Sequence, residues 1–365
     1  MRKKDSHLLS NRYTAIDALR GIAALLVVWQ HSSESFINIA DTAQQGAYLA
    51  TIAKEYDFGR IGIICFFLIS GFVIPSSFKL TGDNPLKTFA IHRFFRLYPA
   101  YWLSLFTIIA FQLFIGIEVK PAAVIANTSM LQSFFSQPHL IGLYWTLQVE
   151  LVFYTLCALL FYFGILHNTK IIFNIILTFF SLFVILQSIA ALTAIDLTIS
   201  KEFQLLPYLL STMFLGSFYR KIYDSKIADK KLVIYTLLAS LMCFGLPLFL
   251  LISAIMGYEL TEHSFRFGAA HCFAFILFFA GIVLLKKTSK VLLWLGAISY
   301  SLYLFHPIVL QILIQITVKG NISYLHGLHL SIYMTITAIT SIIVASIIYI
   351  ILEKPAIRLG RKLSK

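Results

Sequence analysis

Arg20 and His31 are the residues of this chain whose types and spacing first suggest chemistry. They lie in an apolar stretch that begins at Asp17 and reads DALRGIAALLVVWQH. Eleven residues of an α-helix make three turns with a small remainder, so both side chains share one face, about 16 Å apart along the axis. An ionisable group at membrane depth needs a partner or a water-filled cavity. The pattern therefore predicts a cation and a titratable base at two levels of one inward face.

A less specific interpretation of the same stretch stays open. Asp17 and Arg20 are three residues apart, which allows an ion pair on one helix face that only anchors the helix end. His31 would then be an ordinary interfacial residue.

The stretch 144–154, YWTLQVELVFY, adds a carboxylate to the candidate site. Glu150 lies about 9 Å along a helix from Tyr144 and needs a cation or a proton-sharing partner at that depth. We expect it at the level of His31, which suggests a general base (His31) oriented by a carboxylate (Glu150). The alternative is that Glu150 is a structural hydrogen-bonding residue.

Two arginines precede the third apolar segment, in the sequence HRFFRLYP at 92–99. One helical turn places Arg93 and Arg96 on the same side of the chain. Paired guanidinium groups bind phosphates well, which makes this a candidate anion site. The alternative is that both are ordinary basic residues at the membrane boundary.

Two further segments combine polar residues with helix-breaking types. Ser70-Gly71 in the second apolar segment predicts either close helix packing or a break that lines a cavity. His306 directly precedes Pro307, which kinks a membrane helix, so His306 either faces a cavity or satisfies the break. Glu353-Lys354-Pro355 is interpreted as a helix stop at the membrane surface.

The composition is that of an all-α polytopic membrane protein with a single domain, residues 1–365. Hydrophobic residues make up 59% and charged residues 12% of the 365 residues, and the mean hydropathy is +0.84. A bilayer-spanning helix needs about 20 apolar residues. The sequence predicts ten such spans, at 14–33, 58–78, 97–117, 143–165, 171–192, 203–219, 232–256, 267–285, 291–318 and 332–352.

The placement of Lys and Arg predicts the orientation. An even number of spans puts both termini on one side, and 22 of the 29 basic residues fall on that side, 6 on the other and Arg20 within the membrane. By the positive-inside rule both termini are cytoplasmic. This topology also accounts for the net charge of +13 without a nucleic-acid partner. The four cysteines lie in apolar runs without CxxC spacing, so we expect no disulfide framework and no metal site.

Together these segments resemble the acyltransferase-3 family of bacterial membrane proteins. The resemblance rests on an ordered set of motifs across nearly the whole chain, none of them specific alone: Arg20-x10-His31, FFLIS70GF, Arg93-x-x-Arg96-Leu-Tyr-Pro, Trp145-x4-Glu150-x3-Tyr154, Ser299-Tyr-Ser-x-Tyr-x-x-His306-Pro307 and Glu353-Lys354-Pro355. It implies transfer of an acyl group, often acetyl, from coenzyme A to a hydroxyl of a cell-envelope glycan or lipid-linked sugar, at the bacterial inner membrane. Some members carry a C-terminal esterase-like domain, and we expect the form without it.

On this resemblance the site residues receive expected roles. Arg93 and Arg96 hold the phosphates of acyl-CoA, and Arg20 takes a deeper negative group. His31 deprotonates the acceptor hydroxyl, with Glu150 as its partner. Ser70, Trp145, Tyr154 and His306 complete substrate binding. We expect direct transfer, although an acyl-histidine intermediate stays open.

Two other functions fit part of the pattern. A transporter or flippase for a sugar or lipid-linked glycan would also use broken helices with polar residues at depth, although no inverted repeat is visible. A purely structural scaffold leaves Arg20, His31 and Glu150 unexplained.

Overall fold

The protein is a bundle of α-helices, in agreement with the sequence-based prediction. The computed structural model describes residues 14–39, 42–78, 84–193, 200–225, 227, 229–261, 263–285, 288–319 and 323–364. The α-helices of this part are α2 (Thr14–Ile37), α3 (Ala47–Tyr56), α4 (Phe58–Val73), α5 (Pro85–Phe114), α6 (Pro121–Thr128), α7 (Tyr144–Tyr162), α8 (Thr169–Thr193), α9 (Lys201–Asp224), α10 (Lys230–Ile255), α11 (Ser264–Leu284), α12 (Lys290–Lys319), α13 (Leu330–Ile348) and α14 (Lys354–Leu363). Short 3₁₀ turns occupy Pro75–Ser77, Gln132–Phe135 and Ser323–Leu325, and a π-helical turn occupies Tyr349–Glu353.

Each of the ten ranges expected to span the membrane holds a helix, but not every one of these helices is apolar enough to do so on its own. Within the described residues, eight helices have the length and composition of a membrane span, and α2 and α9 are not among them. Both carry polar or charged residues that lower their hydropathy, such as Arg20 and His31 in α2 and Arg220 in α9. By length and composition, eight of the ten expected spans therefore stand out among the described residues, and the crossing of α2 and α9 stays a prediction.

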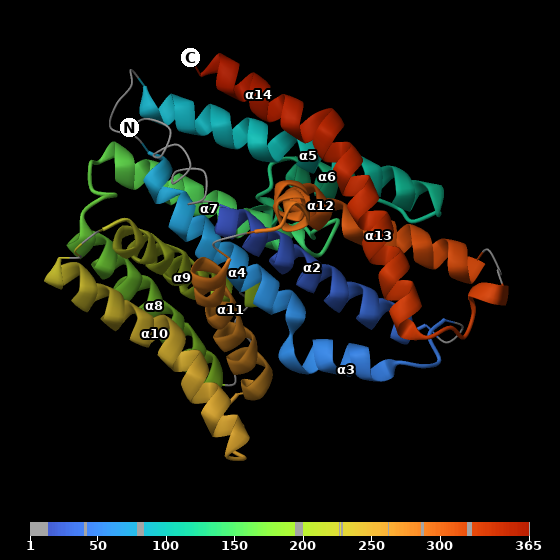
Figure 1. The fold of residues 1–365 in the computed structure, drawn as a ribbon, viewed down its shortest axis with the longest axis horizontal. Helices are drawn as coiled ribbons and strands as arrows, with labels where there is room; N and C mark the ends of the chain where they lie inside the picture. Colours follow the sequence, from blue (N-terminus) through green and yellow to red (C-terminus); the bar gives the residue numbers. More distant parts are fainter. Residues whose placement is uncertain are drawn as a thin grey trace.

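Helix α2 runs through the interior of the bundle (Figure 1). Its most extensive contacts are with α12 and α4, and it also packs against α13, α3 and α11. Its buried residues are spread around its circumference, including Ala18, Leu19, Ala24 and Val28. Because other helices surround it, α2 can carry polar side chains that a lipid-facing helix could not.

Glycines bring α2 and α4 close to their neighbours. A Cβ atom added to Gly296 of α12 would lie 1.9 Å from the Asp17 carbonyl oxygen of α2. One added to Gly71 of α4 would lie 1.8 Å from the Met213 carbonyl oxygen of α9. Small residues allow this close approach of membrane helices, and so the packing interpretation of Ser70-Gly71 is confirmed. The alternative is wrong in its break, since α4 continues to Val73, but Ser70 does line a cavity, as described below.

Two boundaries differ from the sequence-based prediction. Helix α5 begins at Pro85 rather than near residue 97, because Asn84 caps it by accepting a hydrogen bond from the Lys87 amide. Arg93 and Arg96 are therefore helical rather than in a loop. The helix stop expected at Glu353 is instead a π-helical turn that leads directly into α14.

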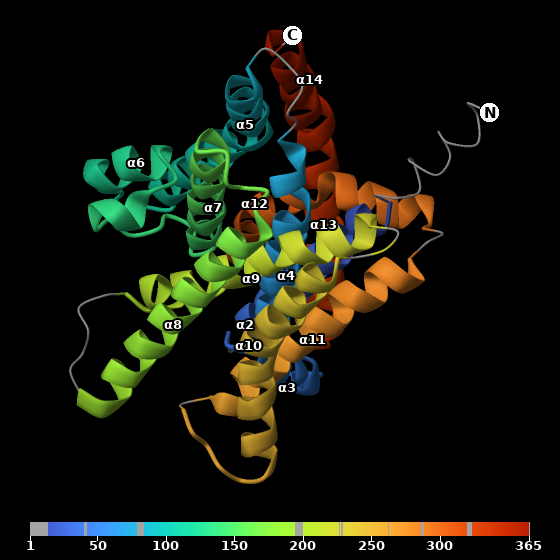
Figure 2. The same cartoon turned by 90° about the vertical axis from the view of Figure 1, so that its left-hand side faces the viewer.

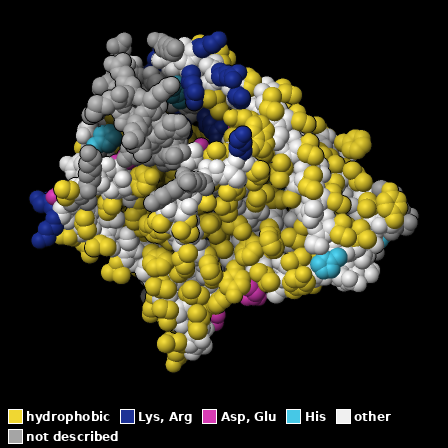
Figure 3. Space-filling view, in the orientation of Figure 1, with side chains coloured by type: hydrophobic (Ala, Val, Ile, Leu, Met, Phe, Trp, Pro, Cys, Tyr) yellow, Lys and Arg dark blue, Asp and Glu magenta, His cyan; other side chains and the backbone are white. Residues whose placement is uncertain are grey.

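Helices α14 and the first half of α5 lie together at one end of the molecule, and α3 lies toward the other end (Figure 2). The surface between these ends is largely apolar. In Figure 3 hydrophobic side chains cover most of the visible face, and Lys and Arg side chains gather at the upper edge, where α14 lies. An apolar belt with charged ends is the surface expected of a protein in a bilayer.

Replacing Gly71 with alanine should destabilise the bundle by about 1–3 kcal/mol, because the new methyl group would overlap the backbone of α9. Thermal unfolding of the purified protein measures the loss. Gly245→Ala in α10 is the matched helical control, since its added Cβ would meet only the Leu241 side chain at 3.3 Å. Equal melting temperatures for the two variants would contradict close contact between α4 and α9.

Candidate active site

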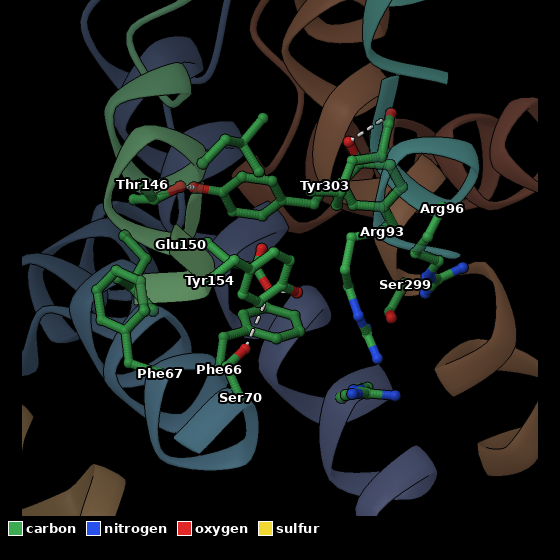
Figure 4. A pocket seen from close by; sticks show the side chains of 15 residues that line it. Phe66, Phe67, Ser70, Arg93, Arg96, Thr146, Glu150, Tyr154, Ser299 and Tyr303 are labelled. Atoms are coloured by element: carbon green, nitrogen blue, oxygen red, sulfur yellow. Dashed lines mark hydrogen bonds between the residues drawn. The ribbon is translucent and has the colours of Figure 1, made fainter. Parts of the chain in front are cut away.

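Most of the residues expected to form the site line one cavity, which we call the arginine cavity. It lies between α2, α4, α5, α7 and α12, and its empty volume, which includes space open to solvent, is about 710 Å³. Figure 4 shows its side chains, with Glu150, Tyr154 and Ser70 meeting at its centre and Arg93 and Arg96 reaching in from α5. The residues predicted from sequence that line it are Arg20, Ser70, Arg93, Arg96, Glu150 and Tyr154.

Glu150 is the hydrogen-bonding centre of the arginine cavity. Its Oε1 atom accepts hydrogen bonds from Ser70 Oγ, at 3.1 Å, and from the hydroxyl of Tyr154 one helical turn away. A carboxylate at membrane depth needs such donors. This arrangement joins α4 to α7 and gives Ser70 and Tyr154 a shared role around Glu150.

Arg93 is a half-buried cation without an acidic partner among the described residues. Its guanidinium carbon lies 5.4 Å from the ring centroids of both Phe89 and Tyr154. No described carboxylate forms an ion pair with it, and its Nε atom is buried without a hydrogen-bond partner. A guanidinium that contacts aromatic faces and no carboxylate retains its capacity to bind a phosphate or another anion.

Arg96 is held differently, although sequence spacing made the two arginines equivalent. Its Nη1 atom forms an ion pair with Oε1 of Glu353, whose side chain is only 1% exposed. Ser301 donates to the other carboxylate oxygen, and Arg96 also stacks over the ring of Tyr300. One nitrogen of the Arg96 guanidinium therefore joins α5 to the π-helical turn that follows α13, and the sequence did not predict this role of Glu353.

Arg20 fits both the functional and the anchoring interpretation of the stretch from Asp17 to His31. It lines the arginine cavity, and it also forms the ion pair with Asp17, Nη1 to Oδ1, at 3.5 Å. Its side chain remains 27% exposed. The i,i+3 pair therefore anchors the guanidinium at the cavity without removing it from solvent.

His31 lines a second cavity, which we call the histidine cavity. It lies between α2, α4, α7, α9 and α11, and its empty volume, which includes space open to solvent, is about 810 Å³. Trp145 lines this cavity rather than the arginine cavity. The motif residues of α2 and α7 are thus divided between two cavities that lie along the same helices.

The expected His31–Glu150 pair is wrong. His31 Nδ1 instead lies 3.0 Å from Nε2 of His306 on α12. The two rings are nearly parallel, 7° apart, and their centroids are 5.3 Å apart, so they meet edge to edge. Helical periodicity predicted the inward face of His31 correctly but could not identify which helix lies opposite.

The hydrogen bonds of His306 determine where the protons of both rings lie. His306 Nδ1 is 3.0 Å from the Leu302 carbonyl oxygen, which can only accept, so this nitrogen carries a hydrogen. In the neutral ring, Nε2 then accepts a hydrogen from His31 Nδ1. Because buried His306, 1% exposed, has no carboxylate partner among the described residues, the neutral form is favoured. His31 is left with an unprotonated Nε2, the atom that a general base needs.

A narrow wall separates the two cavities. Ile63 of α4 lines both of them. Tyr303 lines the arginine cavity, bonds through its hydroxyl to Thr146 Oγ1 at 2.7 Å, and has its ring centroid 6.1 Å from that of His306. Tyr303 and His306 therefore connect the arginine cavity to His31 through side chains in contact.

Four charged residues that line the histidine cavity were not predicted from the sequence: Glu34, Asp57, Arg60 and Arg266. Arg266 of α11 lies with Nε 3.0 Å from Asp57 Oδ2, and Arg60 Nε lies 3.4 Å from the same oxygen. Gln30 donates to Glu34 one turn further along α2. Gln30 and Glu34 flank His31, so helical spacing offered a signal for them, but no local motif pointed to Arg266.

The four cysteines are free, buried and placed on four different helices, α4, α7, α10 and α11. None of them lines either cavity. A nucleophilic cysteine at the described site is therefore absent.

A comparison with profiles of known protein families identifies the family of this chain. A profile described as an acyltransferase domain, that of the acyltransferase-3 family, matches residues 13–352. The chain belongs to the acyltransferase-3 family. It is thus a membrane acyltransferase in general terms, and both cavities lie within the matched range. No curated protein and no solved structure gives a significant match to the chain.

Removing Arg96 should destabilise this acyltransferase by about 3–5 kcal/mol, because Glu353 would keep an uncompensated buried charge. Arg93→Ala is the matched control, since Arg93 has no ion pair to lose. Melting temperatures in one detergent compare the two variants.

The double variant Arg96→Met/Glu353→Gln should recover part of the loss, because it removes the stranded charge as well. If Arg96→Ala and Arg93→Ala melt together, the Arg96–Glu353 pair does not hold α5 to the π-helical turn that follows α13.

Proposed function

We propose that this protein transfers an acyl group, with acetyl as the first expectation, from acyl-CoA to a hydroxyl of a cell-envelope glycan or lipid-linked sugar. The observation that carries the proposal is the division of the site into two cavities that share a wall. One cavity offers a half-buried cation without an ion pair, Arg93, and the other offers an unprotonated imidazole nitrogen on His31. An anionic donor and a hydroxyl acceptor require these two chemistries side by side.

The donor would enter at the arginine cavity. Coenzyme A carries phosphates, which guanidinium groups bind through charge-assisted hydrogen bonds. Arg93 is available for such a contact, and the exposed part of Arg20 adds a second positive charge. Arg96 is the weaker candidate ligand, because Glu353 already binds one arm of its fork.

The transfer itself requires a base and a leaving-group acid. His31 Nε2 would take the proton of the acceptor hydroxyl while its oxygen forms a bond to the thioester carbon. The carbon–sulfur bond then breaks, and the coenzyme A thiolate takes the proton back from His31. His306 would stabilise the transient imidazolium through the Nδ1–Nε2 hydrogen bond, the position in which the sequence analysis placed Glu150. Direct transfer is favoured because no cysteine lines either cavity.

The orientation follows from charge. The end of the bundle that carries α14 and the start of α5 holds the basic residues of both helices, including Lys87, Arg358, Arg361 and Lys362. We place this end on the cytoplasmic side of the bacterial inner membrane, where acyl-CoA is made. The His31 end of α2 then faces outward, toward the acceptor.

Transfer of radiolabelled acetyl from acetyl-CoA to glycan-containing lipid extract by the purified protein tests this function. We expect label on the glycan only when both substrates are present. A transporter or flippase would move the glycan across proteoliposomes without labelling it, and that result would contradict the proposal.

His31→Ala should lower turnover by about 10²–10⁴-fold, because general-base catalysis typically contributes that much. Binding of acyl-CoA should persist, since His31 lies outside the arginine cavity. His306→Ala should show a smaller loss, as it removes the partner of the base and leaves the base itself. Near-normal turnover of His31→Ala would place the base elsewhere.

Arg93→Ala should raise the KM for acyl-CoA by more than tenfold and leave the KM for the acceptor nearly unchanged. Arg93→Lys should recover only part of the affinity, because an ammonium group lacks the planar fork. Initial rates at varied concentrations of each substrate separate the two constants. An unaltered donor KM would return Arg93 to a structural role.

A further inference from the structure

The histidine cavity contains a buried hydrogen-bond acceptor that has no partner. Gln30 is 3% exposed and lines this cavity. Its Nε2 atom donates to Glu34 Oε1, which fixes the orientation of the amide, and its Oε1 atom has no hydrogen-bond donor. A buried unsatisfied carbonyl costs free energy. A site that keeps one beside a catalytic base is suited to a ligand that brings a donor.

Other lining groups of the cavity are acceptors as well. Because His31 donates its Nδ1 hydrogen to His306, the Nε2 atom of neutral His31 is a hydrogen-bond acceptor. His271 lines the cavity with its Nδ1 hydrogen donated to the Phe267 carbonyl oxygen at 2.7 Å, so in the neutral ring its other nitrogen also accepts. Glu34 adds carboxylate oxygens one helical turn from Gln30.

The two arginines of the cavity are paired with carboxylates. Asp57, 6% exposed, lies 3.4 Å from Nε of Arg60 and 3.0 Å from Nε of Arg266, and Arg266 also lies 4.0 Å from Glu34. Two arginines therefore balance two carboxylates. These contacts are ion pairs without hydrogen bonds from Nε, so the buried Nε of Arg266 is a donor that a ligand hydroxyl can satisfy. A cationic ligand would be repelled by the two guanidinium groups. An anionic ligand would compete with Asp57 and Glu34 for the same two arginines. A neutral ligand rich in hydroxyl groups meets neither difficulty.

We infer that the histidine cavity binds a neutral polyhydroxylated sugar, and that Gln30 positions it. The reacting hydroxyl donates to His31 Nε2, and a neighbouring hydroxyl of the same ring donates to Gln30 Oε1. Gln30 and His31 are adjacent in sequence and Glu34 lies one turn further, so one turn of α2 presents three acceptors to one ring. Trp145, which also lines the cavity, supplies an apolar face. This inference rests on the proposed function. It adds that the acceptor sugar is neutral where it enters the cavity and that Gln30 positions it.

The test measures sugar binding separately from acyl transfer. The full-length protein in nanodiscs is titrated with the methyl glycosides of glucose, galactose and mannose, with methyl glucuronide as the anionic probe and glucosamine as the cationic one. Saturation-transfer NMR gives the dissociation constants. We expect at least one neutral glycoside to bind more tightly than both charged probes.

Gln30→Leu should weaken the neutral glycoside by about three- to tenfold, the effect of one lost hydrogen bond. It should also abolish discrimination against the deoxy analogue that lacks the neighbouring hydroxyl. Gln315→Leu in α12 is the matched control, because its Oε1 atom is likewise buried without a partner but Gln315 does not line the cavity. Glu34→Gln, which preserves shape, serves as a second variant if Gln30→Leu fails to fold, and should weaken binding in the same direction.

Preference for a charged probe, absence of neutral binding, or equal effects of Gln30→Leu and Gln315→Leu would overturn the inference. The proposed function fails by a different result. Neutral sugars that bind in a Gln30-dependent way without ever receiving label would preserve this site and refute the acyl transfer.

Discussion

The structure depends on the enclosure of α2. This helix carries Asp17, Arg20, Gln30, His31 and Glu34, and no hydrocarbon environment would accept that set. Contacts with α12, α4, α13 and α11 replace lipid around it. The close approach at Gly296 brings the α12 backbone to Asp17, so the two helices that carry the histidine pair pack tightly together. Removing α2 from lipid contact is what makes polar chemistry possible at this depth.

Enclosure alone does not produce two different cavities. The difference comes from which polar groups are satisfied within the protein. In the arginine cavity the carboxylate of Glu150 has donors and Arg96 has its partner in Glu353, whereas Arg93 lacks an anion. In the histidine cavity the arginines have carboxylates, whereas Gln30 Oε1 lacks a donor. Each cavity therefore presents the complement of a different substrate, an anion in one and a hydroxyl donor in the other.

The motifs of the acyltransferase-3 family gain physical meaning from these contacts. Arg96 and Glu353 are far apart in the chain and form one buried ion pair. His31 and His306 likewise form one hydrogen-bonded pair, and the Leu302 carbonyl determines which nitrogen remains basic. Ser70, Glu150 and Tyr154 form a third group. Motifs that are individually weak thus act as partners across helices.

The sequence by itself determined the helical fold, the location of the helices and the principal polar residues that line the arginine cavity. These are local properties, since hydropathy and helical periodicity depend on neighbours along the chain. Periodicity placed Arg20 and His31 on an inward face, but it could not identify the opposing helix. Only the tertiary structure decided that His31 meets His306 rather than Glu150, that Arg96 is bound while Arg93 is not, and that α2 is enclosed by protein. These outcomes depend on packing between helices that are distant in sequence, where glycine contacts fix separations that no local pattern encodes.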